Sequence, residues 1–294
     1  MRKFFRTIWR ILTAPFRWFG GLVINIRNFF SEEPEDAPLP DALAKTVQDP
    51  MGVLYHLNIL RKHLTRGLIF IVLTTALSFT FIDQIMDFLI QPLPEAQRGL
   101  IAIDPTEPVG TVMRAALLSG VTLGFPYLAL EAWLFIGPGV SRRARFFGLI
   151  AIPIAFLFFV GGMAFAYYVI LPAGLPFLIN FGGFEPQMRA SSYFRFISSL
   201  LFWIGVFFEF PLVVYLLASL GMVQARALAN QWRLAIVIIA IIAAMITPTI
   251  DPVNMALVMG PMSVLFFLSI GLAYIAQAGR ARRQRKQETQ ASGI

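Results

Sequence analysis

The sequence predicts an all-α membrane protein with six transmembrane helices. Hydrophobic residues fill 57% of the 294 positions and charged residues only 14%, with a mean hydropathy of +0.72, which excludes a water-soluble domain. Apolar segments recur near residues 67–82, 109–136, 147–171, 196–220, 234–248 and 254–277. Each of these segments is long enough to cross the roughly 30 Å hydrocarbon core of a bilayer, although two are short.

The distribution of Lys and Arg predicts the orientation of these spans. If the spans alternate in direction, twenty of the 24 basic residues share one side of the membrane. The other four are Arg98, Arg114, Arg189 and Arg195. Because cytoplasmic loops carry the excess of basic residues, we expect a multi-pass protein of the cytoplasmic (inner) membrane with both termini in the cytoplasm.

The chain divides into four segments by composition. Residues 1–30 place apolar side chains at helical spacing between six basic residues, which predicts an amphipathic helix on anionic lipid. A targeting or solubilising extension is the alternative interpretation. Residues 31–52 are acidic and contain proline, as is typical of a linker. Residues 53–279 hold the six spans, and residues 280–294 form a basic cytoplasmic tail.

The stretch "DPTEP" predicts the start of the second span. Thr106 is expected to cap the helix, with Glu107 near the positive end of the helix dipole and Pro108 in the first turn. Arg114, one to two turns further along, is expected either to pair with Glu107 or to point outward.

The fifth span is short and is followed by a tight turn. The run "LAIVIIAIIAAMITP" is at the low end of the usual ~17–25 residues, so it is expected to thin the bilayer locally or to pack inside the bundle. Pro248 and Asp251 belong to the external turn that follows, which Asp251 is expected to close.

Two acidic residues lie within the predicted spans. Glu209 is near the middle of the fourth, where an ionised group costs at least ~2.5 kcal/mol and favours a functional role. Pro211 predicts a kink beside it where a partner could dock. A carboxyl that satisfies a backbone group freed by Pro211 is the structural alternative. Glu131 lies near the cytoplasmic end of the second span, and for it both interpretations stay open.

The sequence lacks the motifs of common enzymes. It contains two His, no Cys, and no HExxH, GxSxG or phosphate-loop motif. Without Cys it can form neither disulfides nor thiolate metal sites. We therefore expect no enzymatic activity, no catalytic residue, no metal and no cofactor. A three-plus-three internal repeat, which many secondary transporters contain, is also missing.

Taken in order, the motifs of this chain resemble the TatC family. They are "HLNILRKHL" before the first span, "DPTEPVGTVMRAALLSG" opening the second, "FPYLALEAWLFIGPGVSRRAR" closing it, then "GGMAFAYYVILP", "GVFFEFP" and "ITPTIDP". TatC is the six-span core and receptor subunit of the twin-arginine protein translocase. The resemblance covers roughly residues 53–279 and is specific as an ordered set.

The resemblance implies a glove-shaped helical bundle with two binding regions. Glu209, with Phe208 and Pro211, would dock the helix of a single-span TatA- or TatB-like protein. The cytoplasmic ends of the first two spans would bind the twin-arginine signal peptide of a folded cargo, and TatC-type oligomers are expected. The candidate signal-peptide residues are His56, Leu57, Ile59, Leu60, Arg61, Glu131, Arg143, Ala144 and Arg145. Motif residues with a structural role are Thr106, Glu107, Pro108, Pro138, Gly139, Pro172, Pro248 and Asp251.

The chain departs from the family at both receptor glutamates. Ile59 stands where the usual pattern His-Leu-x-Glu-Leu-Arg has its acid, and Ala144 stands at the second position. A further acid often found in the last helix is replaced near Phe267. The bases that remain are Arg61, Lys62, Arg142, Arg143 and Arg145. Each would repel an incoming guanidinium by about 1 kcal/mol at close range when exposed.

Glu131 is a candidate for the missing carboxylate. The family commonly has glutamine at this position, two residues before its tryptophan, which is Trp133 here. Because a guanidinium is always charged and is held best by a carboxylate, we expect Glu131 to take over the role of the lost glutamates.

The sequence therefore predicts a core subunit of the twin-arginine translocase, which exports folded proteins using the proton-motive force without ATP chemistry of its own. One alternative is a diverged TatC paralogue that acts as a scaffold beside a receptor-competent copy. Another is a proton-coupled small-solute transporter that uses Glu209 and Glu131. Membrane lipids are expected partners and nucleic acids are not, because the basic residues fall at membrane boundaries.

Overall fold

The computed structural model describes residues 50–137, 142–180, 187–247 and 252–292, and nearly all of them are helical. The predictions for the extension 1–30, for most of the linker 31–52, and for Pro138, Gly139, Pro248 and Asp251 fall outside the described residues. The prediction of an all-α membrane protein is confirmed. Five helical segments are long and apolar enough to cross a membrane, and a sixth, shorter apolar helix covers Trp232–Ile246.

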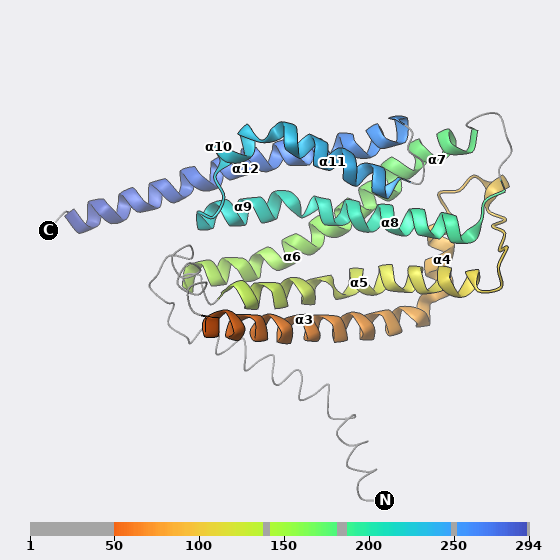
Figure 1. Cartoon of the computed structure of the whole chain (residues 1–294), viewed down its shortest axis with the longest axis horizontal. Coiled ribbons are helices and arrows are strands. Elements are labelled where there is room, and N and C mark those ends of the chain that lie inside the picture. Colours follow the sequence, from red (N-terminus) through yellow and green to blue (C-terminus); the bar gives the residue numbers. More distant parts are fainter. Residues whose placement is uncertain (1–49, 138–141, 181–186, 248–251, 293–294) are drawn as a thin grey trace, which may run out of the picture. The chain divides into compact units, whose positions relative to one another are not determined.

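Figure 1 shows the helices in chain order. Their bounds are α3 Pro50–Ser78, α4 Ile82–Ile90, α5 Glu107–Ile136, α6 Arg142–Phe165, α7 Leu171–Asn180, α8 Ala190–Phe208, α9 Phe210–Leu220, α10 Ala225–Asn230, α11 Trp232–Ile246 and α12 Pro252–Ser292. Short 3₁₀ turns cover Phe79–Phe81 and Glu95–Gln97, and a π turn covers Ala166–Ile170.

The first span is longer than its apolar run predicted. Helix α3 begins at Pro50 and includes the polar stretch "HLNILRKHL", and a short 3₁₀ turn then joins it to α4. Leu, Arg and Lys are good helix formers, so the helix continues where the apolar pattern stops. The candidate signal-peptide residues of this stretch therefore lie on a helix.

The chain forms two compact units. The first contains the described part of residues 50–65 together with 129–137 and 142–151, and the second contains 66–128 and the described residues from 152 onward. Helices α3, α5 and α6 each contribute to both units.

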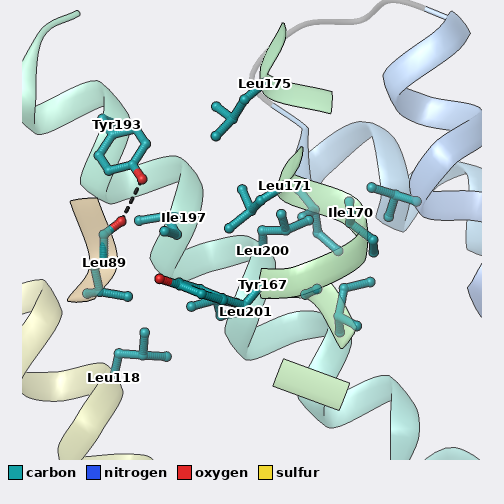
Figure 2. Packing of buried hydrophobic residues seen from close by; sticks show 14 of the residues in the cluster. Leu89, Leu118, Tyr167, Ile170, Leu171, Leu175, Tyr193, Ile197, Leu200 and Leu201 are labelled. Atoms are coloured by element: carbon teal, nitrogen blue, oxygen red, sulfur yellow. Dashed lines mark hydrogen bonds between the residues drawn. The ribbon is translucent and has the colours of Figure 1, made fainter. Parts of the chain in front are cut away.

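The core of the second unit is centred on α8, and the π turn, α7, α11 and α12 also contribute buried side chains to it. Figure 2 shows part of this core, including Leu89 of α4. Tyr193 on α8 donates a hydrogen bond from its hydroxyl to the carbonyl of Leu89, at 2.6 Å. The hydroxyl of Tyr167 donates to the carbonyl of Phe88, also at 2.6 Å, and the rings of Tyr167 and Phe88 stack. In a lipid environment, close packing and satisfied hydrogen bonds hold helices together. The two tyrosines therefore fix the end of α4 in the core.

A π turn precedes Pro172 in the third span. Proline has no N–H, and its ring clashes with the carbonyl four residues back in an α-helix. Residues 166–170 widen into a π turn, in which the N–H of Leu171 donates to the carbonyl of Ala166. The helix therefore continues through Pro172 to Asn180 instead of ending.

The first long helices of the second unit approach closely at small residues. Thr74 on α3 donates a 2.7 Å hydrogen bond to the carbonyl of Gly120 on α5. A Cβ atom at Gly120 would overlap the backbone of Thr75. Small residues at helix contacts are typical of membrane bundles, and here they bring α3 against α5.

Helices α9 and α12 lie side by side in the same unit (Figure 1). Gly221 ends α9 with a left-handed φ of 81°, which glycine adopts without strain. The guanidinium of Arg280 lies against this glycine, and Gln277 donates a 3.1 Å hydrogen bond to the carbonyl of Val223. Helix α12 runs through residue 280 without a break, so the basic tail begins within it.

Candidate functional site

Glu209 occupies a break in the fourth span. Helix α8 ends at Phe208 and α9 begins at Phe210, with Pro211 in its first turn. The N–H of Glu209 donates to the carbonyl of Val206 at 3.1 Å, and the carbonyl of Glu209 accepts from the N–H of Val213 at 2.9 Å. The backbone of Glu209 is thus fully bonded. The carboxyl is different, because its Oε1 atom is buried and has no hydrogen-bond partner among the described residues.

Two phenylalanines flank Glu209 in the sequence, and both pack against other aromatic rings. Phe208 packs against Phe165 with ring centroids 5.6 Å apart, and Phe210 lies 6.2 Å from Phe266 of α12. Phe208 also lies against Gly162 of α6, where an added Cβ would come within 3.0 Å of the ring. Glu209 is therefore a half-buried acid in apolar surroundings, which is costly unless a partner satisfies it.

A second acidic site lies in the first unit, between α3 and α5. Nδ1 of His63 lies 2.5 Å from Oε2 of Glu131, and Glu131 is only 4% exposed. The ring of Phe135, one turn after Glu131, lies 4.6 Å from the ring of His56 and 6.2 Å from that of His63. The two histidines are seven residues apart, so they share one face of α3.

Trp133 holds the start of α6 in this unit. Its Nε1–H donates a 3.2 Å hydrogen bond to the carbonyl of Arg145, and both residues are buried. The indole lies directly on Gly148, where a Cβ atom would overlap the ring. Glycine at this position is thus a packing requirement.

The structure brings together some of the predicted signal-peptide residues. Ile59 follows His56 by one turn and precedes His63 by one, so it lies on the α3 face that meets α5. Leu57, Leu60 and Arg61 are exposed. Arg143 and Ala144 lie in the first turn of α6.

Arg145 differs from the expectation of an exposed, repelling base. Its side chain is 1% exposed and makes interactions of its own. Burial takes this positive charge away from the surface that an incoming peptide would meet. The sequence could not show this, because Arg145 belongs to a run of basic residues that usually face water.

Glu107 pairs with Arg189, not with Arg114. The carboxylate of Glu107 accepts from Nε and lies against the second guanidinium nitrogen of Arg189. The backbone explains this choice, because the N–H of Ile101 donates to the carbonyl of Met188 and the N–H of Ala190 to the carbonyl of Ile101. These two backbone hydrogen bonds place Arg189 beside the start of α5. Arg114 is exposed.

The predicted start of the second span is close to the observed one. Helix α5 begins at Glu107, and the carbonyl of Thr106 accepts from the N–H of Gly110 at 3.3 Å. The N–H of Ile103 donates to the Glu107 carboxylate. The hydrogen bond from Arg189 to this carboxylate raises the pKa of Arg189 above its ordinary value.

Sequence reasoning missed His63, Phe135 and Gly148. The seven-residue spacing of the two histidines was a readable signal, since it places them on one helical face. The partners of Phe135 and Gly148 come from other helices, and no local pattern marks them. Among the described residues, no group of three His, Asp or Glu side chains could hold a metal ion.

Comparisons with known proteins identify the family. Residues 55–261 match the family model described as Sec-independent protein translocase protein (TatC). The chain belongs to the TatC family. It is 32% identical over 263 residues to the Sec-independent protein translocase protein TatC of Koribacter versatilis, covering 87% of this chain and 97% of that protein. It is 33% identical to the protein TatCd of Bacillus subtilis, covering 78% of this chain and 94% of the relative.

A solved structure has the same fold. The crystal structure of the twin-arginine translocase receptor TatC superposes with a TM-score of 0.69 at 28% identity, covering 75% of this chain and 99% of that one. The TatC-family chain is therefore a multi-pass membrane protein and a core subunit of the twin-arginine, Sec-independent protein translocase. Membership in this family favours protein transport over transport of a small solute.

Proposed function

We propose that this TatC-family chain scaffolds the translocase by docking the transmembrane helix of a TatA- or TatB-like protein at Glu209. The chain would lie in the inner membrane with both termini in the cytoplasm, and it would act as a transporter subunit and not as an enzyme. Export of folded proteins would draw on the proton-motive force. Oligomers of the chain and contacts with anionic lipid belong to the same proposal.

One observation carries the docking proposal. The Oε1 atom of Glu209 is buried without a hydrogen-bond partner among the described residues. Each unsatisfied polar group within a bilayer is costly, and polar side chains of neighbouring helices commonly satisfy such groups. A partner helix with a hydroxyl or amide side chain at the matching depth would remove the cost. The helix break at Glu209, with Pro211 beside it, leaves the site irregular enough to accept such a helix.

Co-purification tests this proposal. The full chain is expected to bring TatA- and TatB-like proteins down from detergent-solubilised membranes. Glu209→Ala should reduce the bound fraction about five- to thirtyfold, the effect of one or two kcal/mol. Glu209→Gln should reduce it less, because the amide still forms hydrogen bonds.

The matched control is Glu95→Ala. Glu95 is an exposed acid in the connection between α4 and α5, paired loosely with Arg98 at 3.9 Å. This variant should retain the partners fully. Wild-type chain that brings down no such protein, or Glu209→Ala that retains it undiminished, would contradict the docking proposal.

Recognition of the signal peptide is a separate part of the proposal. We propose that Glu131 supplies the carboxylate that Ile59 and Ala144 do not. Its support is position, because Glu131 lies in the same unit as the predicted signal-peptide residues and faces α3 through His63. Glu131→Gln should diminish crosslinking of a twin-arginine signal peptide to the chain, and undiminished crosslinking would contradict this role.

The diverged paralogue is the second candidate. Loss of both family glutamates favours it, since a scaffold beside a receptor-competent copy does not need them. Expression of this chain as the single TatC-type protein in a cell distinguishes the two candidates. Export of a twin-arginine cargo supports a competent receptor, and export restored only by a second TatC copy supports the paralogue.

A further inference from the structure

Glu131 is the single acid among the described residues of the first unit. Those residues are 50–65, 129–137 and 142–151, and they contain five Lys and Arg residues and two His. A cationic ligand that enters this unit therefore has one described carboxylate to bind.

The carboxylate of Glu131 is occupied in this structure. A buried carboxylate must be paired and hydrogen-bonded, because the loss of hydration costs several kcal/mol. Nδ1–H of His63 supplies one of these hydrogen bonds, at 2.5 Å.

His63 lies on the accessible side of the pair. Its side chain is 16% exposed and that of Glu131 is 4% exposed, so a ligand approaching from the surface meets the imidazole first. The ring of Phe135 lies next to both histidines, and His56 is exposed. A flat aromatic face beside a carboxylate suits a guanidinium, which stacks on rings as well as pairing with acids.

From this geometry we infer that His63 is one of the resting partners of the Glu131 carboxylate and that one guanidinium of a twin-arginine signal takes the place of His63. The inference rests on the proposed signal recognition by Glu131. His63 is thus a positioning residue: it stabilises the buried acid when no signal is bound and leaves when one arrives.

Hydrogen-bond geometry favours the exchange. An imidazole reaches the carboxylate through one N–H, whereas a guanidinium offers two parallel N–H groups and a permanent charge. A lysine ammonium is a point charge without this fork. The exchange therefore predicts discrimination between a twin-arginine and a twin-lysine signal, which simple attraction to a negative charge would not give.

Peptide binding to the purified full chain tests the exchange. Fluorescent signal peptides with two adjacent arginines, or with two lysines in their place, are titrated and the anisotropy is followed. His63→Ala should tighten binding of the arginine peptide about tenfold, because one partner that competes for the carboxylate is gone. His63→Arg should weaken it by a similar factor, since a tethered guanidinium holds the site. Glu131→Gln should remove the preference for arginine over lysine.

The double variant His63→Ala with Glu131→Gln separates competition from structure. If the gain from His63→Ala comes from freeing the carboxylate, it should vanish in the double variant. Weaker binding in His63→Ala, or a gain that persists without the acid, would overturn the exchange and make the pair a structural clamp. Thermal unfolding of each variant in detergent shows that the chain remains folded.

Failure of the inference can be told from failure of the proposed function. If neither wild type nor His63→Ala binds the arginine peptide, the exchange and the proposed role of Glu131 are both wrong. Docking at Glu209 is measured by co-purification in the same preparations and would stand independently. If Glu131→Gln loses the arginine preference but His63 variants change nothing, Glu131 is the receptor acid and His63 is not its occupant.

Discussion

The two partners of the ion pair between Glu107 and Arg189 are buried to different extents, so their removal should cost different amounts of stability. The Glu107 side chain is 6% exposed and that of Arg189 is 42% exposed. Removing the arginine leaves a buried carboxylate without its main partner, whereas removing the acid leaves a guanidinium that already reaches water. The two halves of the pair should therefore not be equivalent.

Arg189→Ala should lower the thermal stability of the chain more than Glu107→Gln. The measurement is the midpoint of thermal aggregation in detergent, followed by size-exclusion chromatography. Arg114→Ala is the control, because Arg114 is exposed and Glu107 does not pair with it. Equal losses from Arg189→Ala and Arg114→Ala would contradict the observed pairing.

At the residue scale, the sequence marked unusual charged side chains, but it did not predict which residues they contact. Glu209 stood out because an acid within an apolar run is rare and costly. Its position at a helix break agrees with the kink that Pro211 predicted. Arg145 was expected at the surface and is buried. Arg114, seven residues after Glu107, was one possible partner for it, but Glu107 pairs with Arg189 and Arg114 is exposed.

At the element scale, α6 contains two adjacent glycines with opposite environments. A Cβ at Gly161 meets no atom within 4 Å, whereas a Cβ at Gly162 would lie within 3.0 Å of the Phe208 ring. In a helix interior alanine is more favourable than glycine by up to about 1 kcal/mol. Overpacking costs about 1–3 kcal/mol. Substitution by alanine should thus change the stability of the chain in opposite directions at these two positions.

Gly161→Ala should leave stability unchanged or raise it slightly, and Gly162→Ala should lower it. Because Phe208 precedes Glu209, Gly162→Ala should also reduce co-purification of a TatA-like partner. Thermal unfolding and the co-purification assay measure the two effects in the same membranes. A Gly162→Ala chain that matches Gly161→Ala in both assays would show that Phe208 moves aside freely.

The sequence predicted the spanning helices, but the observed helix ends differ from the predicted ones. The apolar runs gave the number and order of the spans, because every spanning segment must be apolar along its length. The polar start of α3 and the extension of the third span past Pro172 were not visible in those runs. Helix ends depend on propensity and on local hydrogen bonds, which hydropathy does not measure.

At the scale of the whole molecule, the basic residues predict the topology. Fusion of a reporter that needs disulfides, such as alkaline phosphatase, should be inactive at the C-terminus, because disulfides form outside the cytoplasm. The same reporter inserted after Arg98, in the connection between α4 and α5, should be active. Activity at the C-terminus together with inactivity at Arg98 would reverse the proposed orientation.

The sequence by itself determined the fold class, the number of spans and the family. Each of these follows from composition or from motifs within a few dozen residues. The tertiary structure decided that His63 covers Glu131 and that Arg189 covers Glu107, across separations of 68 and 82 residues. Which polar groups meet in a low-dielectric interior depends on how helices pack, and no local pattern encodes that pairing.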